Sequence, residues 1–120
     1  MSVQSREEGD VLVVYFTDSR ILDEAKIQEI GGQLMALIGQ CSKGRMLLNF
    51  KNVSFMSSAM LGKIILLNKK CKSSNVDLRL CEIAPGIMEV FKVMKLNKVL
   101  NIQKNEEKAI ASFDKKGIFG

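Results

Sequence analysis

The chain has 120 residues, of which 47% are hydrophobic and 26% charged, with a net charge of +5 at pH 7. This length predicts a single domain over residues 1–120 that folds without disulfides or metal. The chain contains no histidine, which removes the commonest general base and the usual zinc ligand. We therefore expect no enzymatic activity, no metal site and no cofactor.

Two further features bear on location and partners. No apolar run is long enough to cross a membrane, and the polar N-terminus does not resemble a secretory signal. The three cysteines, Cys41, Cys71 and Cys81, are widely spaced and predict thiols in a reducing compartment, with Cys71 and Cys81 as small buried hydrophobes. These features predict a cytoplasmic protein without membrane contact.

The basic charge suits either nucleic acid or an acidic protein partner. A nucleic-acid surface usually interleaves basic residues with aromatic ones, and the chain has one tyrosine and no tryptophan. We therefore expect no direct binding of nucleic acid and interpret most lysines as a solvated face.

Hydrophobic periodicity predicts strands that alternate with helices. Gly9-Asp10 is a turn signal, Asp23 a plausible helix N-cap, and Pro85 a helix-start residue. This order predicts an α/β layer around a parallel or mixed sheet. The expected elements are a hairpin over 2–6 and 11–16, a helix over 23–40, a strand over 45–50, a helix from Ser57-Ser58 to the cluster 73–75, a strand over 76–83, a helix from Pro85, a strand over 97–102 and a helix over 106–115.

Two adjacent serines, Ser57 and Ser58, stand where the second long helix is predicted to begin. The first turn of a helix offers unpaired N–H groups and the positive end of the helix dipole. A serine there can cap the helix with its hydroxyl or lie in a simple turn, and a phosphate on it would face the same donors. The residues alone favour the cap over the covalent switch.

The segment LLNFKNVSFMSSAMLGKIILLNKK, residues 47–70, resembles the STAS-domain anti-sigma factor antagonists of bacteria. In that family a strand and a short apolar link lead into Asp-Ser-Ser-Gly-Leu-Gly at the start of the second helix. The resemblance covers nearly the whole chain. It implies a STAS-like α/β fold with a central mixed sheet of four to five strands and about four helices packed mainly on one face.

The junction departs from the family pattern at three positions. Aligned on Leu61-Gly62, Ser57 stands in place of the aspartate and Ser58 keeps the first serine. Ala59 occupies the place of the usual phosphorylated Ser or Thr, and Met60 replaces a glycine. If the chain is phosphorylated, the expected acceptors are therefore Ser58 or Ser57.

The resemblance implies partner switching. The unmodified domain would bind an anti-sigma factor that is also a serine kinase and so release a sigma factor, and a phosphate would end that binding. ATP and magnesium would belong to the kinase, and the chain itself would be a monomer or weak homodimer. The expected partner-binding residues, in the loop and helix at 52–70, are Asn52, Ser54, Met56, Ser57, Ser58, Ala59, Lys63 and Lys70.

Two alternative functions stay open. Ala59 at the usual acceptor position suits a constitutive adaptor or scaffold subunit that needs no phosphate. A small-ligand or lipid sensor is the other alternative, because flexible methionines can line an adaptable pocket, although core packing explains them more simply. These methionines are Met35, Met46, Met56, Met60, Met88 and Met94.

The C-terminal residues Ile118 and Phe119 are apolar candidates for docking on the domain or for a dimer contact.

Overall fold

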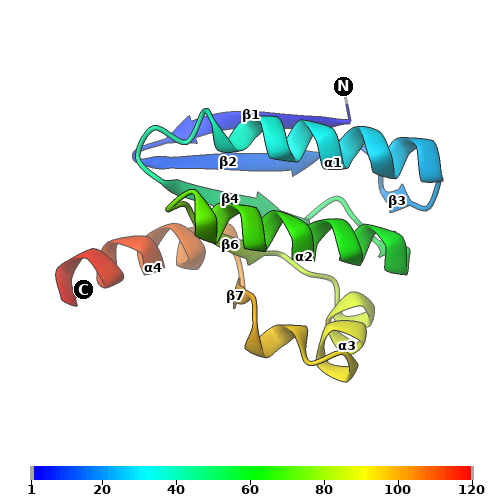
Figure 1. Cartoon of the computed structure of the whole chain (residues 1–120). Coiled ribbons are helices and arrows are strands. Elements are labelled where there is room, and N and C mark those ends of the chain that lie inside the picture. Colours follow the sequence, from blue (N-terminus) through cyan, green and yellow to red (C-terminus); the bar gives the residue numbers. More distant parts are fainter. Residues whose placement is uncertain (1, 120) are drawn as a thin grey trace.

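A five-stranded mixed sheet forms the centre of the computed structural model, which describes the backbone of residues 2–119 and the side chains of residues 2–113 (Figure 1). The strand order is β1-β2-β4-β6-β7, with β1 antiparallel to β2 and the other neighbours parallel. The predicted mixed sheet and the N-terminal hairpin are confirmed. The strands are β1 (Val3–Glu8), β2 (Val11–Phe16), β4 (Arg45–Asn49), β6 (Asp77–Cys81) and β7 (Asn101–Gln103).

Three helices, α1 (Glu24–Ile38), α2 (Ser58–Ser73) and α3 (Pro85–Val93), pack on one side of the sheet, and α4 (Glu106–Phe119) packs on the other. Alternate residues of each strand point to opposite faces, so both sides of the sheet are buried. This arrangement confirms the α/β class with helices mainly on one face. Val14, Leu48 and Leu80 face α1 to α3, whereas Val13, Leu47 and Cys81 face α4.

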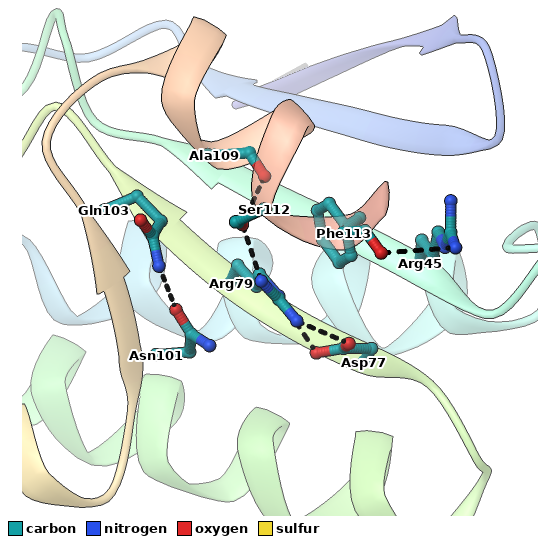
Figure 2. Close-up of polar contacts among 8 residues, drawn as sticks. All are labelled: Arg45, Asp77, Arg79, Asn101, Gln103, Ala109, Ser112 and Phe113. Carbon is teal, nitrogen blue, oxygen red and sulfur yellow. Dashed lines mark hydrogen bonds and ion pairs between the residues drawn. The ribbon is translucent and has the colours of Figure 1, made fainter. Parts of the chain in front are cut away.

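Helix α4 is held by arginines that reach across the second face of the sheet (Figure 2). The guanidinium of Arg79 lies 4.5 Å from the ring centroid of Phe113, and that of Arg45 lies 5.8 Å from the same ring. Arg79 is 4% exposed and is neutralised by Asp77 through two hydrogen bonds of 3.1 and 3.3 Å. It also donates to the Ser112 hydroxyl at 2.5 Å. The buried charge is therefore paired while it fixes the helix.

Two parts of the fold differ from the sequence-based expectation. The predicted strand over 97–102 begins instead as a 3-10 turn at Leu96–Lys98, and β7 forms only afterwards. Leu96 and Leu100 are both buried, and the Leu100 N–H donates to the Leu96 carbonyl at 2.8 Å, which is the hydrogen bond of a helical turn and not of a strand ladder. The last helix continues past the predicted end to Phe119, and the side chains of Ile118 and Phe119 lie outside the described residues.

A second sheet, absent from the prediction, consists of β3 (Arg20–Ile21) and β5 (Phe55–Met56) in parallel. Two-residue strands have no hydrophobic period, so the sequence gives no signal for them. Their pairing brings the segment before α1 beside the segment before α2. Both strands therefore lie next to the serine junction.

The three cysteines are free thiols, with Cys71 and Cys81 buried as predicted and Cys41 half-buried. Burial raises the pKa of Cys41 and of Cys71 to about 11 and that of Cys81 to about 12. The thiols are therefore protonated near neutral pH. None of the helices in residues 2–119 has the length and apolar character that a membrane crossing requires.

Candidate partner-binding site

The loop before α2 is fixed to the rest of the protein by backbone hydrogen bonds. The N–H of Ser54 donates to the Ser19 carbonyl at 2.8 Å, and the N–H of Ser57 donates to the Ile21 carbonyl at 3.0 Å. The Ser54 hydroxyl also donates to Ser19, at 3.1 Å. Because β3 and the preceding Ser19 hold the loop at both ends of β5, the loop presents the serines from a defined backbone.

The beginning of this loop is fixed from the other face of the sheet. Asn49, at the end of β4, is 5% exposed and donates to Glu106 at 2.8 Å, while its side-chain oxygen accepts the Lys51 N–H at 2.8 Å. Glu106 also accepts from the Tyr15 hydroxyl at 2.9 Å and from Arg6 at 2.6 Å. The hydrogen bond with Glu106 raises the pKa of Arg6. The first residue of α4 is thus connected to the serine loop through Asn49.

Helix α2 begins with Ser57 as its N-cap, and the Ser57 carbonyl accepts from the N–H groups of Met60 at 3.1 Å and Leu61 at 3.3 Å. The Ser57 hydroxyl does not cap the helix. Its oxygen is buried and has no hydrogen-bond partner within the described chain, so the side-chain cap expected from the sequence is wrong for Ser57. Ser58 is exposed, and no acceptor within the described chain pairs with the N–H of Ser58 or Ala59.

Helices α1 to α4 differ in whether their first turns have a side-chain cap and an acidic residue. At α1, Asp23 accepts the Lys26 N–H at 3.0 Å and Glu24 adds a negative charge. At α4, Asn105 accepts the Lys108 N–H at 2.8 Å, and the first turn is acidic. Helices α2 and α3 have neither a side-chain cap nor an acidic residue in the first turn. The start of α2 therefore keeps its positive potential.

Most of the predicted partner-binding residues near the serines are accessible. Asn52, Ser54 and Ala59 are exposed, together with Ser58. Met56 is only 7% exposed, so it packs beneath this surface and offers little area to a partner.

The two predicted lysines lie further along α2. The Lys63 ammonium donates to Gln28 on α1 at 3.0 Å, and its stem packs over Gly31. Lys70 is exposed but stands twelve residues after Ser58, which is about 18 Å along a helix. The structure therefore brings neither ammonium group directly to the serines.

The methionines do not line one common cavity. Met46 and Met60 are fully buried in the core, and Met56 is nearly so. Met88 packs against the core, so the expectation that these methionines mostly face the core is confirmed, and only Met35 and Met94 of the six, at 38% and 47%, are exposed. Their distribution gives no support to an adaptable ligand pocket.

A groove that the sequence does not reveal lies beside the serines. It has a volume of ≈ 250 Å³ and lies between β5, the first turn of α2 and α3. Phe55 and Val90 are 46% and 44% exposed there. The surplus of apolar residues on α3 hinted at this surface, but its position depends on β5, which the sequence did not reveal. The lining residues are Ser54, Phe55, Met56, Leu61, Gly86, Ile87 and Val90.

Known proteins share this architecture. The protein BtrV of Bordetella bronchiseptica, which carries the name anti-sigma factor antagonist, is 25% identical over 93 residues, covering 78% of this chain and 79% of BtrV. The solved anti-sigma-factor antagonist (STAS) domain protein from Planctomyces limnophilus superposes with a TM-score of 0.80 at 20% identity, covering 92% and 95% of the two chains. The phosphorylated form of the Bacillus cell fate determinant SpoIIAA gives 0.68 at 19% identity, covering 92% and 98%.

The family model also matches at the level of sequence. The model described as STAS domain aligns with residues 2–109, which include every strand of the sheet, the serine junction and the start of α4. With the mixed five-stranded sheet and the serines at the start of α2, this match establishes that the chain belongs to the STAS domain family.

Proposed function

We propose that this protein is an anti-sigma factor antagonist that acts by partner switching. It binds an anti-sigma factor serine kinase through the loop and helix at 52–70, and the kinase then releases its sigma factor. Family membership and the name of BtrV support the role. The observation that carries it for this chain is the exposed Ser58 on an uncapped, acid-free helix start.

In this mechanism the partner kinase carries out the phosphate transfer. The kinase supplies ATP and magnesium, and the present chain contributes a surface and an acceptor hydroxyl. The protein works in the cytoplasm, where sigma factors act, as a monomer or weak homodimer.

Of the two serines, Ser58 is the proposed acceptor. Its side chain is exposed, whereas the Ser57 hydroxyl oxygen is buried, and a kinase must reach the oxygen that it phosphorylates. A phosphate on Ser58 would face the free N–H groups of the first turn of α2, which favour a charge near −2. The same charge and bulk would disrupt an interface built on that surface. The existence of a phosphorylated SpoIIAA supports such a switch.

A constitutive adaptor is the second candidate. The observation in its favour is Ala59, which is exposed at the place where the family commonly carries its acceptor and has no hydroxyl. An adaptor would bind its partner permanently, and replacing both serines with alanine would leave binding intact.

The two candidates are separated by measuring binding and modification together. Each anti-sigma factor serine kinase of the source organism is purified and titrated against the protein by calorimetry, and MgATP is then added before intact-mass and fragment analysis. We expect one kinase to bind and to place a single phosphate that Ser58→Ala abolishes and Ser57→Ala does not. Binding without phosphate favours the adaptor. If no kinase binds, the proposed function is wrong.

A further inference from the structure

The groove beside the serines has an apolar floor and an open apolar rim. Met56, Leu61 and Ile87 form the floor and are at most 7% exposed, whereas Phe55 and Val90 form the rim and are nearly half exposed. None of the lining residues is charged. A groove of ≈ 250 Å³ with these walls suits one or two apolar side chains of another molecule.

The apolar surface continues along α3. Val93 is 81% exposed and Met94, just after the helix, is 47% exposed. They follow Val90 at spacings of three and four, which places all three on one side of the helix. The groove therefore opens onto an apolar stripe that no described part of the chain covers.

A cation stands at the rim of the groove. Arg20 pairs with Phe55 in the small sheet, and its guanidinium lies 5.6 Å from the Phe55 ring centroid. Arg20 is exposed and, among the described residues, has no carboxylate partner. A guanidinium that contacts an aromatic ring forms no hydrogen bond with it through the carbon that faces the ring, so its N–H donors stay available for a bidentate carboxylate.

We propose that this groove docks a segment of the anti-sigma factor kinase in which a large apolar side chain is flanked by a carboxylate. The apolar side chain enters between Phe55 and Val90, and the carboxylate pairs with Arg20. This inference rests on the proposed function and adds the chemistry of the partner segment. Charge favours this occupant, since the groove itself carries no acid, Arg20 has no carboxylate partner among the described residues, and the whole chain has a net charge of +5.

The groove is continuous with the proposed phosphorylation site. Ser58 lies in sequence between two floor residues, Met56 and Leu61, on the first turn of α2. A phosphate on Ser58 would therefore stand at the edge of the groove. It would repel the acidic partner segment directly, so docking and switching would use the same contact.

Gly86 offers a way to fill the groove without disturbing the fold. It lines the groove at the start of α3, and a Cβ built there meets nothing within 4 Å. Gly86→Leu places a side chain in the space that the partner would occupy. Gly32→Leu is the matched control, because Gly32 is also helical and exposed with free space around it but lies on α1, which contributes no residue to the groove.

The charged half of the proposal is tested with Arg20→Glu. Lys43→Glu makes the same change in net charge on an exposed residue before β4, at the opposite end of the strands from the groove. The four variants and the wild type are compared by calorimetric titration with the purified kinase that wild type binds. Urea denaturation establishes beforehand that each variant is folded.

We expect Gly86→Leu and Arg20→Glu each to weaken binding by at least about tenfold, which corresponds to about 1.4 kcal/mol, with both controls near wild type. Gly86→Leu binding as tightly as Gly32→Leu would overturn the docking site while the proposed function stands. If Arg20→Glu binds the kinase as tightly as Lys43→Glu does, the proposed contact between Arg20 and a carboxylate of the partner is wrong. A small molecule found in the groove by native mass spectrometry of purified protein would also overturn it. If wild type binds no kinase, the proposed function fails, and the inference fails with it.

Discussion

Ser57 and Asp23 occupy the same N-cap position in two helices but use their side chains differently. The Asp23 carboxylate accepts the Lys26 N–H at 3.0 Å, whereas the Ser57 hydroxyl is buried and has no partner in the part of the chain that the structure describes. A capping side chain is worth about 1 kcal/mol, and an unsatisfied buried hydroxyl is itself a cost. We therefore expect Asp23→Ala to lower the free energy of unfolding by about 1 kcal/mol and Ser57→Ala to leave it unchanged or raise it.

Urea denaturation of the two alanine variants beside wild type measures both effects. An equal loss of stability in the two variants would show that the Ser57 hydroxyl does bond to the helix. The pair also bears on function, because a serine whose hydroxyl is buried is a poor substrate for a kinase.

Asn49 is the residue through which the serine loop contacts α4. Its amide donates to the Glu106 carboxylate at 2.8 Å, so Asn49→Asp replaces a donor with a second negative charge of the same shape. We expect a loss of about 2 kcal/mol in the free energy of unfolding, because a buried hydrogen bond is lost and like charges face each other. Urea denaturation of the variant at pH 7 measures the loss.

The double variant Asn49→Asp with Glu106→Gln provides the control. The amide of the new glutamine can donate to the new aspartate, so much of the loss should return. Two substitutions whose effects simply add would indicate that the side chains do not interact.

At the scale of elements, the sequence predicted all of the helices α1 to α4 and the four longer strands of the central sheet, β1, β2, β4 and β6. These elements carry a clear period or an uninterrupted apolar run, as in Val11 to Phe16. It did not predict the β3–β5 pair, whose two-residue strands are too short to show a period. The sequence therefore placed the serine junction correctly along the chain, but it did not predict that Arg20 and Gly86 lie near the junction in the folded protein.

The sequence likewise does not predict which face of the sheet α4 covers. Strand β2 is apolar on both faces, so its pattern accommodates a helix on either side. The choice depends on contacts between distant residues, such as Arg79 with Ser112. The burial of the Ser57 hydroxyl is of the same kind, since it depends on how β3 and β5 pack around it.

Helix α4 should lose its structure when its central aromatic anchor is removed. Phe113 is 1% exposed and contacts both Arg45 and Arg79. Phe113→Ala deletes a fully buried ring and should lower the free energy of unfolding by about 3 kcal/mol. Ile110→Ala is the control on the same helix, because Ile110 is only partly buried and should cost less.

Hydrogen exchange locates the effect. In Phe113→Ala we expect the amides of α4 to lose protection while those of α1 and α2 keep theirs, since the latter helices belong to the other face of the sheet. Uniform loss of protection over the whole chain would instead show that the two faces unfold as one unit.

At the scale of the whole molecule, the sheet separates two tasks. The face covered by α1, α2 and α3 contains the larger core, and the proposed binding surface lies at one edge of it, where β4 and β6 end. The opposite face holds α4, and the contact of Glu106 with Asn49 links that helix to the same edge. A rigid surface of this kind binds a partner with little loss of conformational entropy.

Alkaline titration of Cys81 tests whether α4 excludes solvent from the face of the sheet that it covers, because Cys81 is fully buried beneath that helix. Burial, with a smaller contribution from the charges of Glu82 and Glu106, raises the pKa of its thiol from 9.0 to about 12. Between these values the unfolded chain loses the thiol proton and the folded chain retains it, so the contribution of Cys81 to stability is complete below pH 9 and falls as the pH rises. Under reducing conditions, the free energy of unfolding from urea titrations should therefore fall less steeply between pH 9 and pH 11 in Cys81→Ala than in wild type, by up to about 1.4 kcal/mol per pH unit. The slope is the diagnostic quantity, because the cavity left by the missing sulfur shifts both ends of the curve equally. Parallel curves would mean that the thiolate reaches solvent in the folded protein and that α4 does not seal this face of the sheet.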